Sequence, residues 1–253
     1  MRGEFTLGLM FVNGINIHYE ILGPEDATPP LVLLHGGDPT IETSFGPILP
    51  ELAKQRRVIG FDQAGHGRTE DRPDQPFSFE QTADDAAALL EQLGIDHADF
   101  YGYSNGGTIA LQIAIRYPKI VRKIIVQSAS FSRDGMYPWF WDSMQNAKIT
   151  DMPKQYQDIY QRLSPHPDQL QSYFEKSVKR MIDFKDIPVD SLKRIEAPAL
   201  IMVGDHDVVK PEHAVEMYRL IPNAQLAILP NTDHMKMVER SAWELPLIES
   251  FLG

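Results

Sequence analysis

The Gly-Tyr-Ser-Asn-Gly segment at residues 102–106 constrains the fold of this chain more than any other stretch. It lies between a strand-like apolar run, residues 98–101, and a helix-like run, residues 108–117. In a G-x-S-x-G segment of this context the serine occupies a tight, strained turn, so the flanking positions must be small. The turn would expose the Ser104 hydroxyl above the sheet edge and let the Asn105 N–H donate to an oxyanion. On its own the motif is equally compatible with a plain glycine-rich turn, so the rest of the chain must decide.

Composition indicates one globular α/β domain: 253 residues, of which 43% are hydrophobic and 23% charged. The chain has no cysteine, which excludes disulfides, thiolate metal sites and a cysteine nucleophile. The net charge of −11 argues against nucleic acid and anionic membrane surfaces as partners. No apolar run is long enough to cross a bilayer, and residues 1–12 show no secretory signal. We therefore expect a cytoplasmic protein without membrane association.

Short apolar runs alternate with helical patterns along the chain. The expected strands are residues 11–12, 15–21, 31–34, 57–61, 98–101, 121–127, 198–203 and 225–229, and the expected helices are residues 45–54, 79–93, 108–117, 211–220 and 241–252. Asn13-Gly14 would join the first two strands as a hairpin. Ser78 would cap helix 79–93, with Gln81 at the capping-box position and Gly94 ending the helix. The alternation predicts an α/β fold in which helices flank a mostly parallel, eight-stranded sheet.

Residues 131–190 break this alternation because they contain no convincing strand. A structureless loop of that length is improbable in a compact domain, so we expect an inserted set of short helices. The segment follows strand 121–127 at the carboxyl end of the sheet, where ligands bind in such folds. We therefore divide the chain into a core, residues 1–130 and 191–253, and a helical cap or lid, residues 131–190. Tyr103, Trp139 and Trp141 would line an apolar pocket under the cap; a purely structural extension is the alternative.

A serine hydroxyl becomes an effective nucleophile only with a base and an orienting acid. Of the eight histidines, only His234 follows the last expected strand and precedes the last helix, so it is the candidate base. Asp207, on the loop after strand 198–203, is the candidate acid because it lies further out than Asp205, for which we expect a turn-bracing role. Asp233 is interpreted as a loop residue and His206 as a residue at the solvent edge.

The loop after strand 31–34 supplies a candidate second oxyanion donor. Its sequence is His35-Gly36-Gly37, and glycines let the backbone approach a substrate carbonyl closely. The N–H of Gly37 is the expected donor, beside that of Asn105. For His35 we expect a role in bracing the loop by hydrogen bonds.

Taken together, these motifs resemble the α/β-hydrolase fold family. The resemblance spans residues 11–251 approximately and rests on residues 35–37, 62–68 (Asp-Gln-Ala-Gly-His-Gly-Arg), 102–106, 204–207 (Gly-Asp-His-Asp) and 233–234 (Asp-His). It implies a Ser104/Asp207/His234 triad, an oxyanion hole made by the Gly37 and Asn105 N–H groups, a helical cap at residues 131–190, and no cofactor.

The sequence also departs from the family at several positions. Asp233 stands where many relatives have glycine before the histidine, and Asn105 replaces the Met, Leu or Gln that often follows the nucleophile. A serine nucleophile disfavours haloalkane dehalogenase and epoxide hydrolase chemistry. Residues 61–68 and 35–37 are similar to proline iminopeptidases, but the Trp that usually follows their nucleophile is missing.

These features predict a serine hydrolase that cleaves small carboxylic esters or lactones through an acyl-enzyme, with no metal and no cofactor. Two alternatives use the same triad: hydrolysis of a C–C bond in a diketone-like ring-cleavage product, and amide hydrolysis at an N-terminal proline. A third alternative is a receptor of the hydrolase fold that binds a small ligand and then a protein partner.

Overall fold

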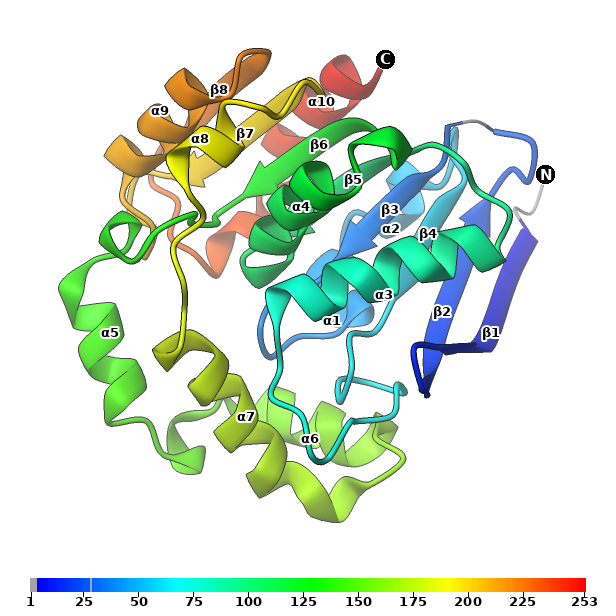
Figure 1. Ribbon diagram of the computed structural model, residues 1–253, viewed down its shortest axis with the longest axis vertical. Coiled ribbons are helices and arrows are strands. Elements are labelled where there is room, and N and C mark those ends of the chain that lie inside the picture. Colours follow the sequence, from blue (N-terminus) through cyan, green and yellow to red (C-terminus); the bar gives the residue numbers. More distant parts are fainter. Residues whose placement is uncertain (1–3, 28) are drawn as a thin grey trace.

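The computed structural model describes residues 4–27 and 29–253, and one eight-stranded sheet forms its centre (Figure 1). The strand order is β1-β2-β4-β3-β5-β6-β7-β8. Strand β2 is antiparallel to β1 and β4, whereas all other neighbours run parallel. The strands are β1 (Glu4–Val12), β2 (Ile15–Gly23), β3 (Leu31–Leu34), β4 (Val58–Phe61), β5 (Ala98–Tyr103), β6 (Val121–Gln127), β7 (Ala199–Gly204) and β8 (Ala224–Leu229). The predicted α/β fold with a mostly parallel, eight-stranded sheet is confirmed.

Helices cover both faces of the sheet. The α-helices are α1 (Ile41–Phe45), α2 (Leu49–Leu52), α3 (Phe79–Gln92), α4 (Asn105–Arg116), α5 (Pro138–Gln145), α6 (Lys154–Leu163), α7 (Leu170–Ile182), α8 (Val189–Leu192), α9 (Pro211–Leu220) and α10 (Ser241–Leu252). Short 3-10 turns occur at η1 (Pro118–Ile120), η2 (Arg133–Gly135), η3 (Ile149–Asp151), η4 (Pro167–Gln169) and η5 (Lys236–Glu239). Buried side chains of α3, α4, α8 and α9 form the core on one face, and those of α1, α2 and α10 form a second core on the other.

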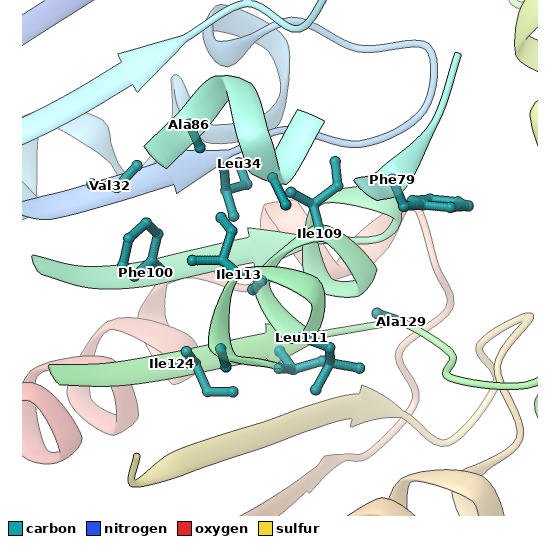
Figure 2. Close-up of a cluster of buried hydrophobic side chains, with 14 of the residues drawn as sticks. Val32, Leu34, Phe79, Ala86, Phe100, Ile109, Leu111, Ile113, Ile124 and Ala129 are labelled. Carbon is teal, nitrogen blue, oxygen red and sulfur yellow. The ribbon is translucent and has the colours of Figure 1, made fainter. Parts of the chain in front are cut away.

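The larger core fixes α4 against the middle of the sheet (Figure 2). Ile109 and Ile113 of α4 are fully buried, as are Phe100 of β5 and Ile124 of β6. Burying a side chain of this size stabilises the fold by about 1.5–3 kcal/mol relative to leaving it in water. Because α4 starts directly after Ser104, this packing also fixes the position of that residue.

Several boundaries differ from the prediction. The predicted helix 45–54 is wrong: the chain forms α1 and α2 as separate short helices. Proline lacks an N–H and clashes with the preceding turn, so Pro50 occupies the start of α2 instead of the interior of a longer helix. The first strand is longer than residues 11–12, because β1 pairs with β2 from Glu4 to Val12. Ser78 does cap α3 by accepting the Gln81 N–H, but the Gln81 side chain bonds to Asp85 and does not complete the box.

Residues 131–190 carry α5, α6, α7 and the start of α8 (Figure 1). Between β6 and β7, a segment described throughout, the chain forms no strand and makes only an isolated bridge, from Met136 to Val209. Helices α5, α6 and α7 lie beneath the sheet in Figure 1, towards the arrowheads of the parallel strands. The division into core and cap at residues 131 and 190 stays a prediction. No helix of the described residues is both long and apolar enough to span a bilayer.

Candidate active site

Ser104 lies in a strained backbone conformation at the turn from β5 to α4. Its φ is 56° and its ψ is −124°, a combination that costs free energy for a residue with a side chain and is a feature of functional turns. The glycines on either side are required sterically. A Cβ on Gly102 would lie 2.0 Å from the Gly106 carbonyl oxygen, and one on Gly106 would lie 1.9 Å from the Leu34 carbonyl oxygen. The G-x-S-x-G spacing therefore follows from close backbone packing.

Ser104, His234 and Asp207 form a continuous hydrogen-bonded line. The His234 Nε2 lies 3.0 Å from the Ser104 Oγ, and its Nδ1 lies 2.7 Å from the Asp207 Oδ1. The carboxylate accepts the Nδ1–H, which leaves Nε2 free to accept the hydroxyl proton. The three residues come from loops after β5, β7 and β8, which end at one edge of the sheet. The structure thus brings together the three side chains that were predicted from the sequence.

The Asp207 carboxylate is buried and fully hydrogen-bonded. Besides His234, it accepts hydrogen bonds from the Ser128 hydroxyl at 2.6 Å and the Val209 N–H at 3.1 Å. Burial alone would raise the pKa of this carboxyl, but attraction to His234 and these hydrogen bonds outweigh burial and lower it. Asp207 is therefore an anion at neutral pH. The sequence did not identify Ser128. Ser128 directly follows β6, just as Ser104 directly follows β5, and its φ is 53°.

Tyr103 supports the loop that carries His234. Its hydroxyl donates to the His234 carbonyl oxygen at 2.8 Å, and the two ring centroids are 5.3 Å apart. Tyr103 also lines the cavity described below, as the sequence predicted. The residue before the candidate nucleophile thus connects the β5 turn to the loop after β8.

The two residues predicted to form the oxyanion hole, Gly37 and Asn105, lie next to each other. A Cβ built on Gly37 would lie 2.7 Å from the Asn105 Nδ2, and both residues line the same cavity as Ser104. Asn105 is the first residue of α4, so its N–H has no acceptor within the helix. Among the described residues, no acceptor is found for the Gly37 N–H either. Both N–H groups are therefore available to a ligand.

The cavity beside Ser104 has a volume of about 290 Å³ and lies between the sheet edge and α5, α6 and α7. Its wall is mainly apolar, and five of the ten methionines line it: Met136, Met144, Met152, Met181 and Met235. Asp38 and Asp151 are its acidic residues, and within the described chain no Lys or Arg lines it. The cavity therefore suits a small, largely apolar ligand.

The prediction that Trp139 and Trp141 line the pocket is wrong. The Trp139 side chain is 55% exposed, and Trp141 donates its Nε1–H to the Arg133 carbonyl oxygen outside the cavity. Helix periodicity is the reason, because Phe140 and Met144 lie one turn apart on the face of α5 that meets the cavity. The aromatic residues on either side of Phe140 consequently point elsewhere.

The neighbouring loop residues behave as expected. Asp205 accepts the Thr232 N–H at 3.0 Å and Asp233 accepts the Lys236 N–H at 2.8 Å, so both brace turns. His206 is exposed. Within residues 4–27 and 29–253, no three acidic or histidine side chains are grouped closely enough to hold a metal ion.

Comparisons with known proteins agree with this fold. The family model of the alpha/beta hydrolase fold matches residues 29–180. A human relative, "Serine hydrolase BPHL", is 30% identical over 90% of this chain and 80% of its own length. The "2-hydroxy-6-oxo-2,4-heptadienoate hydrolase" of Pseudomonas putida is 27% identical, covering 97% of this chain and 95% of the relative. The "Proline iminopeptidase" of Saccharolobus solfataricus is 26% identical, covering 97% and 91%.

The family match covers more than half of the chain, and the human relative extends over most of the remainder. The eight-stranded sheet and the turn that holds Ser104 are the corresponding structural features. The chain belongs to the α/β-hydrolase fold family.

Proposed function

We propose that this protein is a serine hydrolase of small carboxylic esters or lactones, with Ser104 as the nucleophile. The observation that carries the proposal is the line Ser104 Oγ, His234 Nε2, His234 Nδ1, Asp207 Oδ1, with separations of 3.0 and 2.7 Å. This line opens onto a cavity that also exposes the candidate oxyanion donors. A hydroxyl, an imidazole and a carboxylate in this order are the requirements for acyl transfer.

In the first step, the Ser104 oxygen attacks the acyl carbon while His234 Nε2 takes the hydroxyl proton. The carbonyl π electrons move onto oxygen, and the Gly37 and Asn105 N–H groups donate to that oxyanion. Asp207 stabilises the imidazolium that forms. When the tetrahedral intermediate collapses, the C–O bond to the alcohol breaks and His234 returns the proton to the departing oxygen. The product of this step is an acyl ester of Ser104.

In the second step, water replaces the alcohol. His234 Nε2 removes a proton from water, and the resulting hydroxide oxygen adds to the acyl carbon. The same two N–H groups stabilise the second oxyanion. Cleavage of the bond to Ser104 then releases the carboxylic acid, and His234 reprotonates the serine oxygen.

The cavity supports a small and uncharged acyl group as the substrate. Its volume of about 290 Å³ is near the lower end of ligand pockets, which are typically ~300–1,000 Å³. The flexible thioether side chains of its five methionines adapt to acyl groups of different shape. We therefore expect activity on several short esters, without strict selection of one chain.

The charge of the cavity disfavours one of the alternatives, cleavage of a dienoate. The dienoate named for the Pseudomonas relative carries a carboxylate, and a buried carboxylate needs a cation or several hydrogen-bond donors. The cavity of this chain carries Asp38 and Asp151 and, in its described lining, neither Lys nor Arg. This charge supports neutral esters and lactones over dienoate substrates.

A substrate panel tests the proposal. It contains p-nitrophenyl esters of two to eight acyl carbons, γ- and δ-lactones, a prolyl amide and a dienoate. We expect turnover of the short esters or lactones and a loss of about 1,000-fold or more in Ser104→Ala. Turnover of only the amide or the dienoate would favour one of the alternative hydrolases, and full ester turnover by Ser104→Ala would refute the mechanism.

Ser130→Ala is the matched control for this experiment. The Ser130 hydroxyl also lies 3.0 Å from a histidine nitrogen, Nε2 of His213. It donates to the Ser132 carbonyl oxygen, however, and is fully buried away from the cavity. We expect esterase activity to survive this substitution, because proximity of serine and histidine alone creates no nucleophile.

A further inference from the structure

A buried guanidinium connects the cap to the loop of the proposed oxyanion hole. Arg180 is on α7, and only 4% of it is exposed. It forms no direct ion pair with a carboxylate of the described chain, its Nε has no hydrogen-bond partner there, and Asp38 attracts it without contact. Removing an unpaired cation from water costs several kcal/mol, on the order of the whole stability of many domains. We therefore expect a function of the Arg180 guanidinium that offsets this cost.

The guanidinium bonds to two oxygens of the core. Its Nη1 donates to the Gln63 Oε1 and its Nη2 donates to the Gly37 carbonyl oxygen, each at 3.1 Å. Gln63 in turn donates through Nε2 to the His35 carbonyl oxygen at 2.7 Å. Arg180 therefore holds the loop of residues 35–37 at two points. Its side chain lies over the Phe77 and Phe79 rings, at 5.6 and 5.5 Å from their centroids, which fixes its position.

Both peptide units that meet at Gly37 are held through their carbonyls. The His35 Nδ1–H donates to the Gly36 oxygen at 2.8 Å, and Arg180 donates to the Gly37 oxygen. The N–H of a trans peptide points opposite to its C=O, so the first bond sets the direction of the Gly37 N–H, away from the His35 ring. A glycine has more backbone freedom than any other residue, so an N–H at this position needs both anchors to stay aimed.

His66 also contacts the Gly37 carbonyl, but its single N–H is shared between two candidate acceptors. Its Nε2 lies 2.6 Å from the Gly37 oxygen, but its Nδ1 lies 2.9 Å from the Ala64 oxygen. Burial lowers the pKa of His66 well below its ordinary value, so the ring is neutral and carries a single N–H for two carbonyls. Arginine stays protonated in proteins, so its donor to Gly37 is permanent.

We propose that Arg180 is a positioning residue for the oxyanion hole: by holding the Gly37 carbonyl from the cap, it keeps the Gly37 N–H aimed at the substrate oxygen. The inference rests on the proposed function, because the oxyanion that it concerns forms when Ser104 attacks an acyl carbon. It makes docking of α7 on the core a condition for transition-state stabilisation. A purely structural arginine would contribute to folding alone.

The test compares Arg180→Lys and Arg180→Met with Lys176→Met. Lys176 lies one helical turn before Arg180, and it also ties α7 to the core, through Asp71 at 2.7 Å and the Arg72 carbonyl at 2.7 Å, but it does not touch residues 35–37. We would measure kcat and KM on the best ester, the Kd of an alkyl boronic acid that forms a tetrahedral adduct with Ser104, and Tm.

For Arg180→Lys we expect kcat to fall by about tenfold or more, since a lost oxyanion donor costs ~100- to 1,000-fold and a misaimed one costs part of that. KM should change by less than about twofold, and boronic acid affinity should fall in proportion to kcat. Lys176→Met should lower Tm without this selective loss. Arg180→Met should lose more kcat than Arg180→Lys, provided that it folds. If Arg180→Met does not fold, Arg180→Lys, which retains the charge, is the variant that decides the test.

An unchanged kcat and boronic acid affinity in Arg180→Lys would overturn the inference, as would equal effects of Lys176→Met. In that event, loss of activity in Ser104→Ala would still leave the proposed hydrolase function standing. Full activity of Ser104→Ala would remove both.

Discussion

Two buried carboxyl groups in this molecule have opposite protonation, although each ends a line of hydrogen-bonded side chains. One line is Ser104, His234 and Asp207 at the edge of the sheet. The other lies on the face of the sheet that α10 covers. It runs from the Tyr101 hydroxyl to Gln127 and from Gln127 to the Glu244 Oε1, and each link is 2.5 Å long. Both residues are buried, with an exposed fraction of 2% or less.

Attraction to His234 and the hydrogen-bond donors explain the difference. Asp207 accepts from His234, Ser128 and Val209, and its pKa is lowered despite burial. Glu244 accepts from Gln127 alone and its Oε2 has no partner among the described residues, so burial raises the pKa of this carboxyl to about 8. A histidine partner and the number of donors, more than depth, decide which buried carboxyl is an anion at neutral pH. Only the anion can stabilise an imidazolium.

Removing a hydrogen-bond donor from Asp207 should shift the pKa of its carboxyl upwards, towards that of Glu244. Ser128→Ala deletes a hydrogen bond to a charged group, which is worth ~1.5–3 kcal/mol, so we expect kcat/KM for the best ester to fall by roughly tenfold or more. Because the folded-state pKa of Asp207 is depressed, its contribution to stability is present above the unfolded-state pKa and is lost as pH falls through the folded-state pKa. In Ser128→Ala the folded-state pKa should rise towards the unfolded-state pKa, so this contribution should be smaller and its loss should be complete at a higher pH.

The measurement for Ser128 is kcat/KM at neutral pH together with Tm between pH 3 and pH 6, with Ser130→Ala as control. Ser130 is also a buried serine after β6, but it does not touch Asp207. Equal activity and equal acid sensitivity of the two variants would show that the Ser128 hydrogen bond has no part in setting the charge of Asp207.

The second variant concerns the Glu244 line and affects stability without affecting activity. The folded-state pKa of Glu244 is about 8 and its ordinary value is 4.5, so the folded protein retains a proton that the unfolded chain releases. Stability should therefore decrease as pH rises from about 4.5 to about 8, by up to ~1.4 kcal/mol per pH unit. Glu244→Gln keeps the acceptor for Gln127 and removes the titration.

We expect Glu244→Gln to match the wild type in Tm near pH 4.5 and to exceed it near pH 8, with ester turnover unchanged. A shift of about 2–4 °C per kcal/mol makes the difference measurable by thermal denaturation. A constant Tm difference across this range would show that the Glu244 carboxyl does not titrate between these values.

The sequence predicted the elements whose signals are local. Strands and helices alternate with clear apolar runs, and the glycines of residues 102–106 stand where the fold leaves no room for a Cβ. His234 and Asp207 were identified by their order after strands, because parallel strands bring their carboxyl ends to one edge. The positions of these three loops follow from chain topology.

Features that depend on three-dimensional packing were not predicted. Trp139 and Trp141 were chosen for their chemistry, but the phase of α5 turns Phe140 to the cavity instead. Ser128 carries no motif, and its contact with Asp207 exists only because β6 and β7 are neighbours. Arg180 is one of many cationic residues in the sequence, and only burial against residues 35–37 distinguishes it.

Covalent labelling tests the central claim most directly. A fluorophosphonate reacts with an activated serine, so intact-protein mass spectrometry should show one added group, and peptide mapping should locate it on Ser104. The label should be absent in Ser104→Ala, much slower in His234→Ala and undiminished in Ser130→Ala. A label on another residue, or equal labelling of Ser104→Ala, would contradict the account.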